Sequence, residues 1–244
     1  WAEVSLINVG FGISSRDEAL KVGKKWFPLN KGGGYRKWSG NNSNLVNWQE
    51  DGKDIKHSIV TKYPYLNGNP DFVAKNPTKY FLAGVTWGAI SSTYFSVRWD
   101  EQGFIPSNAG MKVYSPDTKT LARLICLLNS KVTVPLLGAM SATMNFDQGL
   151  IKRLPVDEDL ELNPWPLISL ARSDWDGYET SWDFSTCPLL QFDHFAATLE
   201  SSYIGLRTHW QSKTDEMQRL EEENNRIFID AYGLQDELTP EVPL

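Results

Sequence analysis

The part of the sequence richest in chemically useful side chains is a short segment that mixes basic, aromatic and amide residues with glycine. It contains a triple glycine at positions 32–34 together with Lys31, Tyr35, Arg36, Lys37, Trp38, Asn41 and Asn42. Lysine and arginine bind phosphates or guanine edges, and asparagine can bond two edge atoms of adenine. Glycine tolerates positive φ and lets backbone amides approach a phosphate. The segment predicts DNA contact, and a solvated loop with packed aromatic residues is the competing interpretation.

Three hydroxyl side chains farther along the chain could also read DNA. They are Thr86, Ser91 and Ser92, which lie in or between two strand-like runs within residues 80–99. Hydroxyl groups can bond base edges in the major groove, and the same residues are common in tight turns. The residues alone leave both interpretations open.

The sequence lacks the segments that an adenine methyltransferase needs for chemistry. Such enzymes use a glycine-rich turn for the methyl donor and an Asn/Asp-Pro-Pro-Tyr/Phe segment for the flipped adenine. The segment Asn69-Pro70-Asp71-Phe72 has aspartate in place of the second proline, and Asn163-Pro164-Trp165-Pro166 has the wrong order. We therefore expect no catalytic residue and no bound cofactor in this chain.

Other site chemistries are also missing. The three histidines, His57, His194 and His209, lack metal-ligand spacing, so we expect no metal site. Neither a P-loop nor a Gly-x-Ser-x-Gly elbow is present. Cys126 and Cys187 form no Cys-x-x-Cys pair and fit free thiols in a reducing cytoplasm. Charged residues and a proline interrupt the apolar stretch 121–140, so we expect no membrane association.

The charge distribution divides the 244 residues into two parts. The net charge is −6, but residues 1–156 hold 19 Lys and Arg against 11 Asp and Glu, a net of +8. Residues 157–244 hold 5 against 19, a net of −14. A basic part attracts DNA phosphate and an acidic part is repelled by it. We predict a DNA-binding domain at 1–156 and an acidic, mostly helical C-terminal or spacer region at 157–244.

The elements expected around these residues give an α+β fold, a mixed-sheet domain with helices that precedes a mainly helical part. Residues 27–43 have the composition of a loop or hairpin, and short strands are expected at 44–48, within 80–99 and at 112–114. Ser115 is the expected N-cap of a helix over 117–129, followed by a helix over 130–139. Two further helices are predicted over 189–210 and 215–232, with Gly233 as the stop and Glu221-Glu222-Glu223 on a solvated face.

Several segments spread over the chain resemble one family. The segment from Lys25 to Trp48, which contains the triple glycine, is similar to the BREX phage-defence adenine methyltransferases called PglX. Further similar stretches are Val85–Trp87 with Ile90–Ser92 and Phe95–Arg98, Leu127–Lys131 running to Asn145–Ile151, Tyr178–Phe184 with Pro188–Leu189, and Asn225–Leu238. The Leu-Leu-Asn-Ser-Lys and Tyr-Gly-Leu stretches also occur in combined restriction–methylation enzymes.

The resemblance implies that the chain is the target-recognition region of a larger N6-adenine DNA methyltransferase. The S-adenosylmethionine and adenine motifs would then lie before Trp1, in an N-terminal domain. The chain would read a short, asymmetric duplex site, with Lys31, Arg36 and Lys37 on phosphates. The residue types, and not the resemblance, suggest Asn41, Asn42, Ser91 and Ser92 for the base edges.

Two other functions remain open. The acidic part would serve as an assembly module that docks on its own methyltransferase domain or on other BREX proteins. Alternatively, the chain would be the specificity region of a combined restriction–methylation enzyme. A basic DNA-binding face would also attract a phage inhibitor that mimics DNA with acidic residues.

Overall fold

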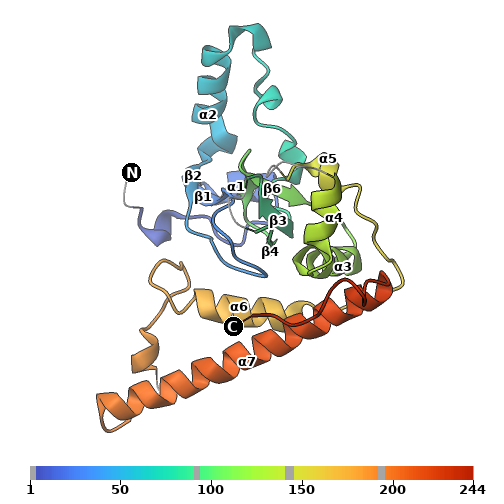
Figure 1. Cartoon of the computed structure of the whole chain (residues 1–244). Helices are drawn as coiled ribbons and strands as arrows, with labels where there is room; N and C mark the ends of the chain where they lie inside the picture. The colour runs from blue at the N-terminus through green and yellow to red at the C-terminus, as the bar shows by residue number, and fades with distance from the viewer. Residues whose placement is uncertain (1–3, 91–93, 141–145, 192–195, 244) are drawn as a thin grey trace.

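Two small sheets form the body of the molecule, and helices extend from it on opposite sides (Figure 1). The computed structural model describes residues 4–90, 94–140, 146–191 and 196–243. In the first sheet, β1 (Trp26–Asn30) pairs antiparallel with β2 (Leu45–Asn47) and parallel with β5 (Ile105–Pro106). The strand expected at 44–48 is confirmed. Of the loop or hairpin expected over 27–43, the hairpin is confirmed, because β1 and β2 pair antiparallel around the segment, and Phe27 of β1 is fully buried in a core cluster.

The second sheet is antiparallel, with β3 (Gly84–Gly88) between β4 (Val97–Asp100) and β6 (Gly110–Val113). Val85, Trp87 and Val97 are buried, so one face of this sheet contributes to the largest core cluster. The strands expected in 80–99 and near 112–114 are confirmed.

Helix α3 (Thr118–Asn129) covers this sheet because its apolar residues recur at helical spacing, and α4 (Thr133–Met140) follows it. Both predicted helices are confirmed. The N-cap is Asp117, however, whose carboxylate accepts from the backbone N–H groups of Lys119 and Thr120. Ser115 accepts from the N–H of Asp117 instead. Two accepting oxygens satisfy two free helix donors at once, which explains the correction.

The C-terminal part consists mainly of α6 (Trp165–Trp175) and the long α7 (Leu199–Ala231), which lie side by side below the sheets in Figure 1. The sequence predicted two helices where the structure has one of 33 residues, about 50 Å long. No proline interrupts residues 211–214, so the helix continues across them. Gly233 has a φ of 66° and follows α7, which confirms the predicted stop.

Core packing joins the two parts of the chain. One buried cluster contains Val85 and Ile125 from the α/β body together with Ile168, Phe228 and Ile229 from α6 and α7. Two buried amides reinforce this contact. Asn224 donates to the carbonyl of Cys126, and Asn225 accepts from the N–H of Lys131. The amides therefore satisfy backbone groups that the end of α3 leaves unpaired.

A projection formed by residues 49–79 extends from the opposite side of the sheets (Figure 1). It contains α2 (Gln49–Lys62) and the 3₁₀ turns η2 (Pro64–Leu66), η3 (Pro70–Phe72) and η4 (Pro77–Lys79). At its base, Asp51 pairs with both Arg16 and Lys56, and Trp48 packs edge-on against Tyr80. The remaining short helices are η1 (Leu6–Asn8), α1 (Arg16–Val22), α5 (Gln148–Ile151) and η5 (Pro188–Leu190).

Candidate nucleic-acid interface

The glycine-rich loop (residues 31–42) connects β1 to β2 and lies against the edge of the second sheet. Its anchor is Trp38, which is 1% exposed. The N–H of Trp38 donates to the carbonyl of Val97, and its carbonyl accepts from the N–H of Trp99. These bonds use backbone groups at the edge of β4 that the sheet itself leaves unpaired. The loop is therefore a fixed part of the fold.

Glu221 of α7 holds the same loop from the other side. One of its carboxylate oxygens accepts from the indole N–H of Trp38, and the other accepts from the ammonium of Lys37 at 2.8 Å. Glu221 is buried, so its prediction as part of a solvated face is wrong. A buried carboxylate is stable only with partners of this kind, and here both partners come from the glycine-rich loop.

Arg36 joins the loop to α6. Its Nη2 donates to the carbonyl of Ala171 at 3.0 Å and to Asp174 at 2.6 Å. Its Nε donates to the carbonyl of Ser39, and its guanidinium lies 5.2 Å from the ring centre of Trp175. These four contacts come from groups of the protein itself, so Arg36 fixes the loop on the helical part.

Glycine is required where the loop passes the second sheet. Gly32 has a φ of 85°, and a Cβ there would lie 2.7 Å from the carbonyl oxygen of Ala109. The carbonyl of Gly32 accepts from the buried guanidinium of Arg98 at 2.9 Å. Burial lowers the pKa of Arg98 to about 10, which still leaves it charged at neutral pH. Farther along, the amide of Asn41 donates to the carbonyl of Gly34 and closes the loop.

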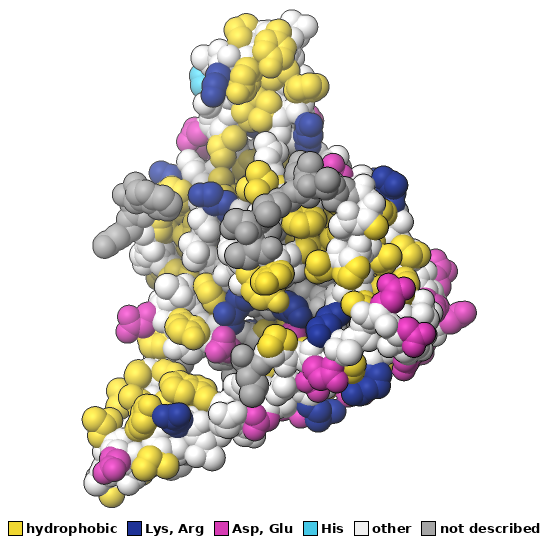
Figure 2. Space-filling view, viewed as in Figure 1, with side chains coloured by type: hydrophobic (Ala, Val, Ile, Leu, Met, Phe, Trp, Pro, Cys, Tyr) yellow, Lys and Arg dark blue, Asp and Glu magenta, His cyan; other side chains and the backbone are white. Residues whose placement is uncertain are grey.

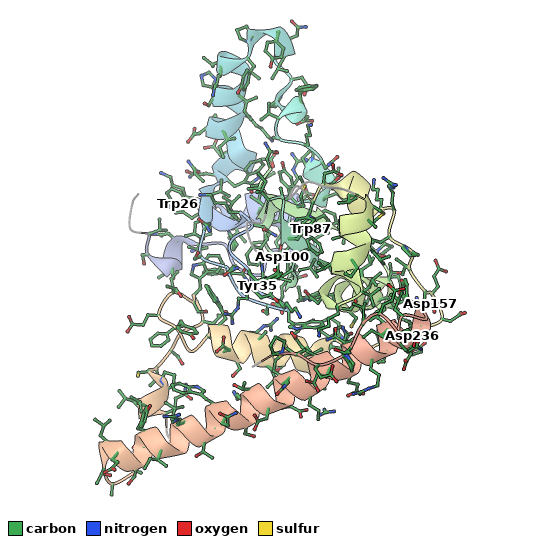
Figure 3. The ribbon with its side chains drawn as sticks, viewed as in Figure 1. Trp26, Tyr35, Trp87, Asp100, Asp157 and Asp236 are labelled. Atoms are coloured by element: carbon green, nitrogen blue, oxygen red, sulfur yellow. The ribbon has the colours of Figure 1, made fainter. Side chains whose placement is uncertain are left out.

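Other predicted residues of the loop face outward. Lys31 and Tyr35 are exposed, and Asn42 is half-buried. Figure 2 shows Lys and Arg side chains gathered near the middle of the visible face, where the surface is hollowed between the sheets and the C-terminal helices. Figure 3 places Tyr35 at this region, and its ring lies 6.0 Å from that of Tyr94. The loop thus has a buried anchor and an accessible surface.

Thr86 is an interior residue. Its hydroxyl donates to the carbonyl of Met111 and accepts from the amide of Asn30, which also donates to Asp100. Asp100 forms an ion pair with Lys112 at 2.7 Å, and both side chains are 1% exposed. This buried network ties the two sheets together behind the glycine-rich loop. Ser91 and Ser92 lie outside the described residues.

A groove of about 1000 Å³ separates the loop from the C-terminal helices. One wall is residues 35–38 of the glycine-rich loop, and the other comes from α6, α7 and the turn around Cys187. Its lining mixes aromatic, apolar and charged groups, including Trp210, Met217 and Lys213. We call it the α6–α7 groove. It brings four of the predicted residues together: Tyr35, Arg36, Lys37 and Trp38.

Sequence reasoning missed Asp174, Glu221 and the projection. The opposite net charges of residues 1–156 and 157–244 gave a partial indication of these contacts. If the two parts pack together, acidic residues of the second part lie near basic residues of the first. Nothing in the local sequence shows which carboxylate meets which base. The projection was missed because Pro64, Pro70 and Pro77 divide it into short turns without helical or strand periodicity.

The described residues hold no group of three or more His, Cys, Asp or Glu side chains that could bind a metal ion. Both cysteines are free, as predicted, and burial raises the pKa of Cys126 to about 12. Within the same described part, no single helix has the length and apolar character of a membrane span. Only α3 and α4 taken together reach that length, with a bend of 79° between them.

Two curated relatives match almost the whole chain. It is 36% identical over 253 aligned residues to the adenine-specific methyltransferase PglX of Lacticaseibacillus casei (strain Zhang), covering 99% of this chain and 20% of that protein. It is 29% identical over 244 residues to the adenine-specific methyltransferase BrxX of Escherichia coli O9:H4 (strain HS), covering 98% and 18%. The chain is homologous to the C-terminal part of these methyltransferases.

This homology confirms the resemblance to PglX inferred from the sequence. The chain spans about a fifth of the length of the curated relatives it matches. No protein-family model matches it.

Proposed function

We propose that the chain recognises a short, asymmetric duplex DNA site for a larger N6-adenine methyltransferase of a BREX phage-defence system. The observation that supports this most is the construction of the glycine-rich loop. Trp38 and Arg36 anchor it to the sheet and to α6, while Lys31 and Tyr35 are exposed. A rigid base with exposed polar and aromatic groups is what base reading requires, because a positioned side chain discriminates better than a mobile one.

The geometry divides the predicted residues into two roles. Lys31, Tyr35 and Asn42 are the ones we assign to direct DNA contact, with Lys31 on phosphate. Arg36, Lys37, Trp38 and Asn41 position the loop, and Thr86 positions the sheet behind it. We further propose that S-adenosylmethionine binds outside this chain, since the sequence lacks both the cofactor turn and the adenine-holding segment.

The DNA-binding part of this function is tested by measuring how tightly the chain binds a mixed-sequence duplex, with fluorescence anisotropy over a series of salt concentrations. Replacing Lys31 by Glu should weaken binding and reduce the salt slope by about one, because one phosphate contact is lost. Replacing Lys119 by Glu is the matched control, since Lys119 is exposed, lies outside the glycine-rich loop and pairs with Glu161. Equal binding by both variants and the unchanged chain would reject the assignment.

A second function, assembly with the methyltransferase domain, is favoured by the first half of α7. There Leu199, Tyr203 and Ile204 are exposed, with Leu199 73% and Ile204 57% accessible. Figure 2 shows hydrophobic side chains gathered at this end of the molecule. Exposed apolar groups in such a cluster are typical of a surface that another protein covers.

The assembly role is tested with Leu199→Ser and Ile204→Ser. Both changes should abolish co-purification with the methyltransferase portion of the enzyme while leaving duplex binding unchanged. Retained co-purification would reject this role.

If the parent enzyme also cleaves unmethylated duplex, the chain would instead serve a combined restriction–methylation enzyme.

A further inference from the structure

The projection formed by residues 49–79 has no role in the glycine-rich loop or the α6–α7 groove. It rises from the opposite side of the sheets and ends in a tip built from the turns η2 and η3 (Figure 1). Its helix α2 becomes regular after Gly52, and the ten regular residues 53–62 span about 15 Å. Neither the loop nor the groove accounts for the shape of the projection.

The base of the projection is rigid. Asp51 pairs with Arg16 of α1 and with Lys56 of α2, and Trp48 packs against Tyr80 at a centroid distance of 5.3 Å. Hydrogen bonds from Arg16 and Lys56 outweigh the opposing effect of burial and bring the pKa of Asp51 to about 2. The base therefore holds its charges paired over the whole neutral pH range.

Lysines near the tip and on the returning segment differ from those near the base. Lys53 and Lys56 form ion pairs with Glu50 and Asp51. Lys62, Lys75 and Lys79 are exposed, and no carboxylate among the described residues pairs with them. Residues 49–79 hold five Lys against four Asp and Glu, a net of +1, so the positive charge available to an external anion comes from these three ammonium groups, with the carboxylate of Asp71 on the same element.

The tip adds exposed aromatic surface. Tyr65 is 69% exposed and Phe72 is 63% exposed, and Figure 2 shows hydrophobic side chains concentrated there. The ammonium of Lys75 lies 5.6 Å from the ring centre of Phe72, and that of Lys62 lies 5.4 Å from the ring centre of Tyr63. Basic groups interleaved with aromatic rings match a phosphate backbone beside stacked bases.

We infer that the projection is a second DNA-binding element, whose lysines hold phosphates on the sides of a groove that the aromatic tip enters. This inference rests on the proposed function, because it assigns a further contact with the same duplex. An aromatic or apolar wedge in a groove unstacks a base step and bends the duplex, so the tip would read DNA shape and deformability. The glycine-rich loop would read base edges.

The test measures duplex binding by the 244-residue chain over a series of salt concentrations. The variant Lys62→Gln, Lys75→Gln, Lys79→Gln should reduce the salt slope by about three and weaken binding at least roughly tenfold at low salt. The matched control is Lys21→Gln, Lys119→Gln, Lys152→Gln, which removes the same charge from exposed lysines outside residues 49–79. That control should change the slope by less than about one.

A second variant, Tyr65→Ala with Phe72→Ala, separates wedge insertion from charge. It should keep the salt slope but lower affinity and reduce the bend of the duplex, measured by resonance energy transfer between labelled DNA ends. All changed side chains are exposed, so thermal unfolding should match that of the unchanged chain.

The outcomes separate the inference from the function on which it rests. If the lysine variant binds duplex with an unchanged slope while Lys31→Glu weakens binding, the projection is not a DNA-binding element. That result overturns the inference and leaves the proposed function standing. If the unchanged chain fails to bind duplex at low salt, both are rejected.

Discussion

Glu221 on α7 accepts a hydrogen bond from the indole of Trp38 across 183 positions of sequence. The same carboxylate accepts from Lys37, so one acidic residue of the C-terminal helix holds two neighbouring residues of the glycine-rich loop. Residues that we predicted to contact DNA are thus positioned by the acidic part of the chain. The separation into a basic and an acidic part describes charge, while the packing joins the two.

Replacing Glu221 by Ala should lower the free energy of unfolding by about 2–3 kcal/mol, because the buried indole N–H and the Lys37 ammonium lose their acceptor. Glu221→Gln keeps an oxygen for the indole and should cost about 1 kcal/mol. Urea unfolding measures both. Glu223→Ala is the control, since Glu223 is exposed and pairs only with Arg219 among the described residues, and it should have almost no effect. Equal stability of all three variants would contradict the assignment.

Replacing Gly32 by Ala should destabilise the protein by roughly 1–3 kcal/mol and weaken duplex binding. The added Cβ would meet the carbonyl of Ala109, and a φ of 85° strains any L-residue. Gly34→Ala provides the matched control, because nothing lies within 4 Å of a Cβ there. Thermal unfolding and anisotropy with duplex DNA give the comparison. A neutral Gly32→Ala variant would mean that the loop rearranges freely.

The Asp51 carboxylate should make stability depend on pH in the acid range. Its pKa is lowered to about 2, so the stability it contributes is present above the unfolded value of about 3.9 and is lost as pH falls toward about 2. Asp51→Asn should therefore destabilise the protein at neutral pH, and the difference from the unchanged chain should shrink below about pH 4. Chemical unfolding at a series of pH values measures this. A difference that stays constant would show that the ion pairs with Arg16 and Lys56 contribute nothing.

An acidic protein that mimics DNA should compete with duplex for the chain. Competition is expected because both ligands present an extended array of negative charge to the same basic side chains. It should weaken as salt rises and should be reduced in the Lys31→Glu variant. Anisotropy of labelled duplex in the presence of the mimic provides the measurement. Simultaneous binding of both ligands would reject a shared surface.

Local sequence signals predicted much of the fold but little of the interface. Leu121, Ile125 and Leu128 recur at helical spacing, and α3 follows from that pattern. The burial of Trp38 and Thr86 could not be predicted in the same way, because it depends on partners at Glu221, Asn30 and Met111 that are distant in sequence. A single polar or aromatic residue in a loop has no periodicity that could indicate which side faces the core.

The projection shows a different limit. Its position comes from the positive φ values of Glu50, Asp51 and Gly52, which turn the chain away from the sheet before α2 becomes regular. Such values are uncommon for residues other than glycine and are not evident from residue type. The Arg16 and Lys56 contacts that hold Asp51 there are long-range, so the element could be described only with the structure in hand.

The attachment of the glycine-rich loop to α6 and α7 bears on attempts to exchange specificity between relatives. A graft of residues 31–42 alone would bring new reading side chains onto foreign supports, because Asp174 and Glu221 would stay behind. The transplanted loop would then have the donor's side chains without the contacts that position them. A chimera that moves the loop together with α6 and α7 keeps these contacts, so under the proposed function the loop and the C-terminal helices would have to be exchanged together to transfer target choice.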